Sequence, residues 1–329
     1  MKQLRWATRI LLLVMVSLFV VSGASDAAIV LKIANPLPRD NPSTQALMYF
    51  AELVKQRSNG EVAPEVFDNS TLGTAVENFE MLQLGTLEMV FISAGPASQF
   101  APEWEIFSLP YVFRNREHMF AALNGDFGRA MEEDVNKQGV VFLGWYDSGD
   151  RNIITAKKPV ASFADLKGLK IRVMESKVMV DSINALGAIA TPMGQGEVYS
   201  ALQQSVIDGW ENNPPTLLSQ KIYEVSPYYA WTRHFMTPDA LLISKIAFDK
   251  LSAEHKKIVL DAAREASEKQ HTDWAAYMNT VVDELKKVGC TFTDVKDIDN
   301  FIKAVEPVKE SYKKKHGTKF IEMVNSYVK

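Results

Sequence analysis

The ionisable and nucleophilic side chains of this chain do not form a recognisable catalytic or metal-binding motif. No H-E-x-x-H, G-x-S-x-G or P-loop sequence occurs in its 329 residues, and Gly194-Gln195-Gly196 lacks the third glycine of a dinucleotide-binding turn. The histidines are scattered along the chain, at His118, His234, His255, His271 and His316. The sequence therefore favours binding over catalysis and predicts no metal ion and no cofactor. A hydrolase assembled from distant residues is the disfavoured alternative.

One charged side chain, Arg172, stands where it could hold an anion. In the run from Leu169 to Val173, apolar side chains alternate with Lys170 and Arg172, as expected for a strand with one buried face. A carboxylate that leaves water for a closed cleft needs a fixed pair of donors. The planar guanidinium offers them in bidentate form, whereas an ammonium group does not. An ordinary exposed strand arginine is the competing interpretation.

The N-terminus has the pattern of a secretory signal peptide. Lys2, Arg5 and Arg9 supply positive charge, and a largely apolar run of about twelve residues follows at 10–21. Such a run is too short to span a bilayer comfortably, which takes roughly 20 residues, so a membrane anchor is the weaker interpretation. Small residues lead up to Ala27. We therefore expect export to the periplasm, with cleavage near Ala27.

Composition and cysteine content agree with an exported globular protein. The chain is 47% hydrophobic and 23% charged, which is ordinary for one large domain or two domains. Its net charge of −4 does not suggest a nucleic-acid partner. Cys290 is the single cysteine, so an intramolecular disulfide and a lipidated N-terminal cysteine are both excluded. We interpret Cys290 as a small apolar residue at a helix-to-strand turn.

Alternating strand and helix patterns predict an α/β fold with parallel sheet. A strand at Ile29–Ala34 is followed by a helical apolar stripe with Ser43 as its N-cap, and then by a strand at Val62–Phe67. This β-α-β order favours parallel pairing. Further strands are expected at 87–93, 140–145, 169–173 and 206–209. Further helices are expected at 77–84, 117–123, 130–137, 176–186, 197–204 and, in more than one segment, 252–287.

Several short segments share a family pattern. They are 82–89, 109–113, 165–173, 186–188, 191–193, 197–199, 201–204 and 208–212. In register over essentially the whole mature chain, these segments resemble the periplasmic solute receptors of TRAP (tripartite ATP-independent periplasmic) transporters, the DctP family. The most specific of them is the run that begins at Asp165 and ends at Val173.

The resemblance implies a two-lobed periplasmic-binding-protein fold of type II, a Venus-flytrap with a ligand cleft between two α/β lobes and a long helix spanning both. It implies a signal peptide at 1–27, lobe I at 28–149 plus 238–278, and lobe II at 150–237 plus 279–329. It also implies a small organic acid as ligand. The implied partners are a small and a large membrane subunit, and the cleaved chain itself would not span the membrane.

The resemblance also indicates which residues hold the ligand. Arg172 matches the arginine that the family carries on this strand, and Arg151 matches a second arginine common in these sites. Asn212 matches the asparagine that follows Asp-Gly-x-Glu. Glu77, at the start of a helix, matches a frequent polar contact from the other lobe. A plain first-turn helix acid is the alternative interpretation of Glu77.

Two further residues are expected at the cleft because of their place on strands. Asn35 and Ser93 each follow or end a strand, and α/β folds bind ligands beyond the carboxyl ends of their strands. Both are polar and could donate or accept a hydrogen bond to a ligand.

Three departures from the family pattern bear on the ligand. Gln195 stands in a stretch where many members have an aromatic residue. Asn213 stands where a proline is common, and the pair Asn212-Asn213 resembles members that bind sugar acids. Trp210 replaces a glutamine and could narrow the pocket, stack on the ligand or pack in the core. These changes favour a hydroxy or sugar acid. A C4-dicarboxylate or another small carboxylate is the alternative ligand, and a binding protein that feeds a signalling receptor is the alternative function.

Overall fold

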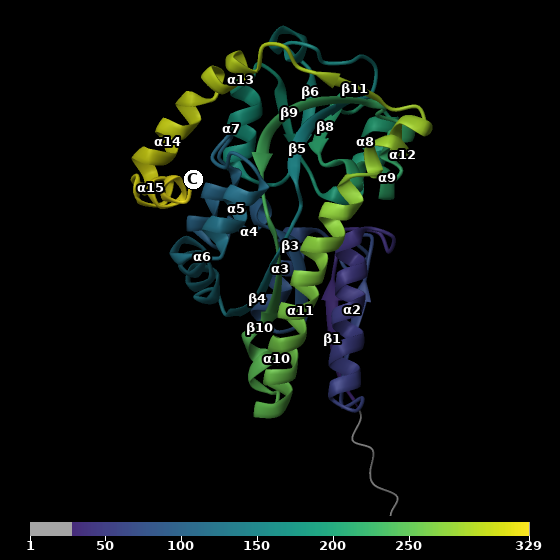
Figure 1. Cartoon of the computed structure of the whole chain (residues 1–329), viewed down its shortest axis with the longest axis vertical. Coiled ribbons are helices and arrows are strands. Elements are labelled where there is room, and N and C mark those ends of the chain that lie inside the picture. The colour runs from purple at the N-terminus through teal and green to yellow at the C-terminus, as the bar shows by residue number, and fades with distance from the viewer. Residues whose placement is uncertain (1–27, 329) are drawn as a thin grey trace, which may run out of the picture.

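The computed structural model describes residues 28–328, which fold around two mixed sheets (Figure 1). The predicted signal peptide and its cleavage site near Ala27 lie outside the described residues. The first sheet has the order β2-β1-β3-β10-β4. Its strands are β1 (Ile29–Ala34), β2 (Val62–Phe67), β3 (Met89–Ser93), β4 (Val140–Tyr146) and β10 (Asp239–Ser244).

In the first sheet, β1 pairs in parallel with β2 and β3, whereas β10 runs antiparallel to both β3 and β4. One face of this sheet packs against α2 (Pro42–Arg57) and α11 (Ala253–Met278). The other face is covered by shorter helices. They are α3 (Ala75–Leu84), α4 (Ala94–Ala97), the 3-10 helix η1 (Pro102–Ser108), α5 (Arg116–Leu123) and α6 (Asp126–Asn136). The short helix α10 (Lys245–Asp249) follows β10.

The second sheet has the order β11-β9-β5-β8-β6-β7 and lies in the other half of the molecule (Figure 1). Its strands are β5 (Asp150–Thr155), β6 (Lys170–Val173), β7 (Ile189–Pro192), β8 (Gly209–Asn212), β9 (Tyr228–Met236) and β11 (Thr291–Asp294). The helices on its faces are η2 (Phe163–Leu166), α7 (Lys177–Ala185) and α13 (Ile298–Ala304) on one side, and α8 (Val198–Gln203), α9 (Pro214–Ser219) and α12 (Val281–Lys287) on the other.

The chain passes between the two halves more than once. It crosses from β4 to β5, returns from β9 to β10, and crosses again at the end of α11, a helix of 26 residues. Helix α11 packs on α2 and β4 of the first half, and contacts α9 and α12 of the second. The expected α/β fold with two halves and a long helix that reaches both is confirmed.

The last two helices return to the first half. Helices α14 (Glu306–His316) and α15 (Lys319–Ser326) contribute Val308, Tyr312, Phe320 and Val324 to the apolar core beside the first sheet. Figure 1 shows them descending beside α5 and α6. No helix within residues 28–328 has the length and apolarity needed to cross a bilayer.

Two local expectations are wrong. The N-cap of α2 is Asn41, whose side chain accepts a hydrogen bond from Ser43 N at 3.0 Å, so the helix begins one residue before Ser43, with Pro42 at its first position. The strand expected at 206–209 is instead β8, which starts at Gly209. A Cβ at Gly209 would lie 2.5 Å from the Ile154 carbonyl oxygen, so the close approach of β5 requires glycine there.

Candidate functional site

A pocket lies between the two sheets and is lined by side chains from both. Ser93 and Asp239 come from strands of the first sheet, and Arg151, Arg172 and Asn212 come from strands of the second. The long helix α11 adds Trp274, and the 3-10 helix η3 (Gln195–Glu197) adds Gln195. The empty space between these side chains is about 620 Å³, which includes the part open to solvent.

Arg172 presents its guanidinium group at this pocket from β6. The side chain is only 1% exposed. Its Nε and Nη2 donate to the Met193 carbonyl oxygen at 3.0 and 2.7 Å, and its Nη1 donates to Gln195 Oε1 at 3.0 Å. These three bonds fix the plane of the guanidinium while leaving donor capacity unused, because the group carries five N–H donors.

No carboxylate within residues 28–328 forms an ion pair with Arg172 at 4.0 Å or less. Burial lowers its pKa to about 10, and the more distant Glu211 carboxylate partly opposes this fall. The group therefore stays charged at neutral pH. A buried cation without a direct counter-ion is costly unless something else supplies the negative charge. The surroundings of Arg172 are thus chemically suited to an anionic partner.

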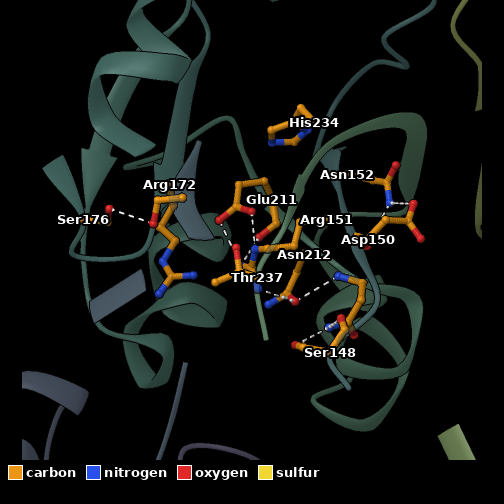
Figure 2. Close-up of polar contacts among 12 residues, drawn as sticks. Ser148, Asp150, Arg151, Asn152, Arg172, Ser176, Glu211, Asn212, His234 and Thr237 are labelled. Atoms are coloured by element: carbon orange, nitrogen blue, oxygen red, sulfur yellow. Dashed lines mark hydrogen bonds and ion pairs between the residues drawn. The ribbon is translucent and has the colours of Figure 1, made fainter. Parts of the chain in front are cut away.

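Arg151, on β5, differs from Arg172 because a carboxylate pairs with it. Its Nε donates to Glu211 Oε2 at 2.5 Å and its Nη2 to Glu211 Oε1 at 2.9 Å, so a buried carboxylate already neutralises it. Its Nη1 donates to Asn212 Oδ1 at 3.2 Å. Figure 2 shows Arg151, Glu211 and Asn212 drawn together, while the Arg172 guanidinium lies apart from them. Arg151 lines the pocket, but its charge is committed within the protein.

Asn212 joins this group at the end of β8. Its Oδ1 accepts from Arg151 Nη1 and from Asn213 N, the latter at 2.9 Å. The oxygen is therefore occupied, and the amide nitrogen is the part of Asn212 left for another partner. Since Asn212 also lines the pocket, its amide can donate a hydrogen bond there.

Gln195 links Arg172 to the other half of the molecule. Its Oε1 accepts from Arg172, and its Nε2 donates to Gln220 Oε1 at 2.6 Å. Gln220 Nε2 in turn donates to the Pro36 carbonyl oxygen at 3.3 Å, which belongs to the loop after β1. A chain of three hydrogen bonds thus runs from the guanidinium to the first half.

Three of the predicted site residues have structural partners and do not line the pocket. Asn35 Nδ2 donates to Thr44 Oγ1 at 2.8 Å and to the Leu37 carbonyl oxygen at 3.0 Å, which shapes the loop after β1. Glu77 accepts from Thr74 N at 2.8 Å in the capping box of α3. These bonds to the backbone and hydroxyl of Thr74 lower the Glu77 pKa.

Asn213 is the third. It caps α9, because its Oδ1 accepts from Thr216 N at 2.8 Å, and its Nδ2 donates to the Ser148 carbonyl oxygen at 2.8 Å. Both ends of the amide are therefore engaged, and the side chain is 1% exposed. The structure places Asn213 behind the pocket wall, where it fixes α9 and the chain crossing before β5.

Trp210 packs in the core of the second half and does not line the pocket. It is fully buried with Ile154, Leu217 and Tyr229. On β8 its side chain points to the face covered by α9 and α12, and its indole Nε1 has no hydrogen-bond partner among residues 28–328. Of the two roles left open by the sequence, the structure places Trp210 in core packing.

Several residues that line the pocket were not predicted from the sequence, and Asp239 and Trp274 are two of them. Asp239 opens β10 and is 6% exposed, and Trp274 lies on the pocket-facing side of α11 at 1% exposed. Asp239 had one local signal: a carboxylate after Thr237-Pro238, directly before the apolar run of a buried strand. Trp274 had none, since an aromatic in a helical stripe usually signals core packing.

Ser93, which was predicted, lines the pocket beside Asp239. The two residues are directly opposite in the antiparallel pairing of β3 with β10. Ser93 Oγ is buried and has no hydrogen-bond partner among the described residues. Unsatisfied buried hydroxyls are rare in folded proteins and call for a specific explanation. No set of three or more His, Cys, Asp or Glu side chains in residues 28–328 is arranged to hold a metal ion.

Comparison with known proteins gives consistent matches. Residues 33–315 match the family described as bacterial extracellular solute-binding protein, family 7. The C4-dicarboxylate-binding periplasmic protein DctP of Rhodobacter capsulatus is 34% identical over 230 residues, which cover 69% of this chain and 68% of that protein.

Solved structures match over nearly the whole described chain. A TRAP periplasmic solute-binding protein from Citrobacter koseri with bound D-glucuronate is 38% identical, with a TM-score of 0.86, and the match covers 90% of this chain and 98% of that one. Another, from Roseobacter denitrificans with bound β-D-glucuronate, is 31% identical, with a TM-score of 0.87 and coverage of 90% and 99%.

Proposed function

This chain belongs to the bacterial extracellular solute-binding protein family 7, and from that premise we propose that it is the periplasmic receptor of a TRAP transporter for a sugar or hydroxy acid. It captures the acid as an anion and delivers it to a membrane permease made of a small and a large subunit. The predicted signal peptide, with cleavage near Ala27, brings it to the periplasm. No catalytic step is part of this proposal.

The observation that carries the proposal is the buried guanidinium of Arg172. The ligand carboxylate is the missing counter-ion, and it can accept from the donors that Met193 and Gln195 leave free. A charge-assisted, bidentate contact of this kind is among the strongest hydrogen-bonded pairs that a protein forms. Lysine in this position would lack the planar fork.

The rest of the pocket suits a ligand that carries hydroxyl groups. Gln195 and Asn212 offer amide groups, and Ser93 offers a hydroxyl without a protein partner. Arg151 is balanced by Glu211, so it supplies hydrogen-bond donors without adding net positive charge. The glucuronate bound by the two related structures combines one carboxylate with several hydroxyls.

The two halves act as the lobes of a clamp in this proposal. Lobe I comprises 28–149 and 238–278 and lobe II comprises 150–237 and 279–329, although α14 and α15 pack on lobe I. Hydrogen bonds already join the lobes at the pocket mouth, from Gln220 to Pro36 and from Asn41 Nδ2 to Ser219 Oγ at 3.1 Å. A ligand that touches both lobes favours closure through its extra contacts in the closed form.

Calorimetry on an Arg172→Gln variant tests the proposal. We expect the mature protein to bind D-glucuronate or another hydroxy acid, and the variant to lose about 2–5 kcal/mol of binding free energy, the usual cost of removing one partner of a buried charge pair. Arg129→Gln is the matched control because Arg129 is exposed and pairs with Asp126 at the surface. Unchanged affinity in Arg172→Gln would overturn the site assignment.

A C4-dicarboxylate is the second candidate ligand, favoured by the DctP relative of Rhodobacter capsulatus. Titration of the same protein with malate and succinate decides between the two ligand classes. Tighter binding of these diacids than of any hydroxylated monoacid would favour the second candidate.

A further inference from the structure

We infer that Asp239 selects a singly charged, hydroxylated acid over a dicarboxylate by accepting hydrogen bonds from ligand hydroxyls on the lobe I side of the pocket. This inference rests on the proposed function and names the ligand class more narrowly. It assigns to Asp239 the recognition of the part of the ligand that Arg172 does not hold.

The position of Asp239 sets it across the pocket from Arg172. Asp239 starts β10 of the first sheet, and Arg172 lies on β6 of the second sheet. Both line the pocket between the sheets, and both are at least nine-tenths buried. A small ligand whose carboxylate meets Arg172 therefore presents its remaining groups toward Asp239.

The carboxyl group of Asp239 has no cationic partner among the described residues. It forms no ion pair within residues 28–328, because the neighbouring charges have other partners. Arg151 is bound to Glu211, and Asp147, near Asp239, is bound to Arg116. The Ser93 and Ser148 hydroxyls help to stabilise the Asp239 carboxylate, but no cation among the described residues pairs with it, and burying a carboxylate without such a partner is expensive. Hydrogen bonds from ligand hydroxyls would offset that cost.

Ser93 completes a pair of polar groups suited to hydroxyls. It faces Asp239 across the β3–β10 pairing, and its buried hydroxyl helps to stabilise the Asp239 carboxylate. A carboxylate accepts hydrogen bonds only, whereas a hydroxyl both donates and accepts. Asp239 and Ser93 together match adjacent hydroxyl groups, each of which also donates and accepts. A second ligand carboxylate would instead place two acceptors, both negative when ionised, next to each other.

Protonation of Asp239 tunes this selection. Burial raises its pKa to about 7, and the Arg151 charge partly opposes the rise. The charged or titratable groups around it are Arg151 on β5, Asp147 after β4, and Tyr146 on β4, and burial raises the pKa of Tyr146. As pH rises through 7, Asp239 becomes ionised and repels a second carboxylate more strongly. The preference for a monoacid over a diacid must therefore grow with pH.

Competition calorimetry with the mature protein tests the inference, using D-glucuronate and the dicarboxylate D-glucarate as probes. In Asp239→Asn we expect D-glucuronate to bind roughly 10- to 100-fold more weakly, since hydrogen bonds to a charged acceptor are strong, and D-glucarate to gain relative to it. The affinity for D-glucuronate divided by the affinity for D-glucarate should rise from pH 5.5 to 8.5 in the wild type. In Asp239→Asn this ratio should not change with pH. Asp181→Asn, an exposed surface change on α7, is the control.

The outcomes separate this inference from the function on which it rests. If the wild type binds D-glucuronate but Asp239→Asn keeps both the affinity and the pH-dependent ratio, Asp239 has only a structural role and the inference is overturned. A flat ratio in the wild type overturns it as well. If the wild type binds none of the hydroxylated acids, the proposed function is overturned, because its ligand class is then wrong. Thermal unfolding of the ligand-free variant shows whether it is folded in each assay.

Discussion

At the residue scale, the two buried arginines of the pocket differ in what balances their charge. Both carboxylate oxygens of Glu211 accept hydrogen bonds from Arg151, whereas Arg172 donates to the neutral oxygens of Met193 and Gln195. Neutral acceptors fix the position of the Arg172 guanidinium without cancelling its charge. Of these two arginines, Arg172 is therefore the one whose charge no protein carboxylate pairs directly, and in the proposed function a ligand carboxylate takes that place.

Trp210 provides a residue-scale prediction that separates packing from recognition. Because its side chain fills the core between β8 and α9, Trp210→Ala should lower the free energy of unfolding by about 3–5 kcal/mol, the usual cost of removing a buried tryptophan. Trp210→Phe should cost less, since it keeps most of the apolar volume. Urea unfolding measures both effects.

The ligand preference of Trp210→Phe is the decisive readout. We expect its rank order across a panel of hydroxy and dicarboxylic acids to match that of the wild type, because Trp210 does not line the pocket. A changed rank order at unchanged stability would show that Trp210 takes part in recognition.

At the element scale, helix N-termini on both sides of the pocket are set by capping side chains. Asn41 caps α2, Thr74 and Glu77 cap α3, and Asn213 caps α9. Each cap satisfies backbone N–H groups that a helix cannot satisfy itself. Asn213 also bonds to Ser148, at the crossing from β4 to β5. Glu77 and Asn213, which suggested a ligand site in the sequence, thus hold the helices around the pocket.

Asn213 carries the prediction at this scale. Asn213→Ala should destabilise the protein by about 1 kcal/mol through loss of the α9 cap, and it should also remove the bond to Ser148. Asn213→Asp is the matched variant, because it keeps the acceptor for Thr216 N and loses only the donor to Ser148. Thermal unfolding of both variants separates the two contributions; equal stability of all three proteins would contradict the capping role.

At the scale of the whole molecule, the pocket exists because repeated crossings of one chain hold the two sheets on either side of it. Arg172 and Asp239 lie in different halves, and hydrogen bonds such as Gln220 to Pro36 and Gln99 Nε2 to the Glu175 carbonyl oxygen, at 2.6 Å, bridge the halves. Apolar contacts cross between the halves as well, because Val178 of α7 packs in the core beside the first sheet and Tyr111 packs against the core of the second half. A change in the angle between the halves would have to rearrange these polar and apolar contacts together.

Closure on the ligand is the prediction at this scale. Small-angle X-ray scattering should show a smaller radius of gyration for the mature protein when saturating D-glucuronate is added, because a ligand held by both halves favours the closed form. Arg172→Gln should show no such change at the same ligand concentration. A radius of gyration that is identical with and without bound ligand would contradict closure.

The sequence by itself determined the parts of this protein that depend on local pattern. Runs and alternation of apolar residues predicted β1, β2, β3, β4 and β6, and helical periodicity predicted α2, α3, α5, α6, α7, α8, α11 and α12. The strands β5, β7, β9, β10 and β11 were not predicted. The motif around Arg172 placed the arginine on β6. The single Cys290 excluded a disulfide. Such features depend on neighbours within a few positions along the chain, so one sequence is enough to reveal them.

Only the tertiary structure decided which side chains line the pocket. Arg151 and Glu211 are 60 residues apart, and Asp239 and Ser93 come from distant strands that pair only in the folded sheet. Strand alternation shows that Trp210 and Glu211 point to opposite faces, but it does not show which face meets a helix and which meets the cleft. That choice depends on how the two sheets are covered and how they face each other, which is set by packing across the whole chain.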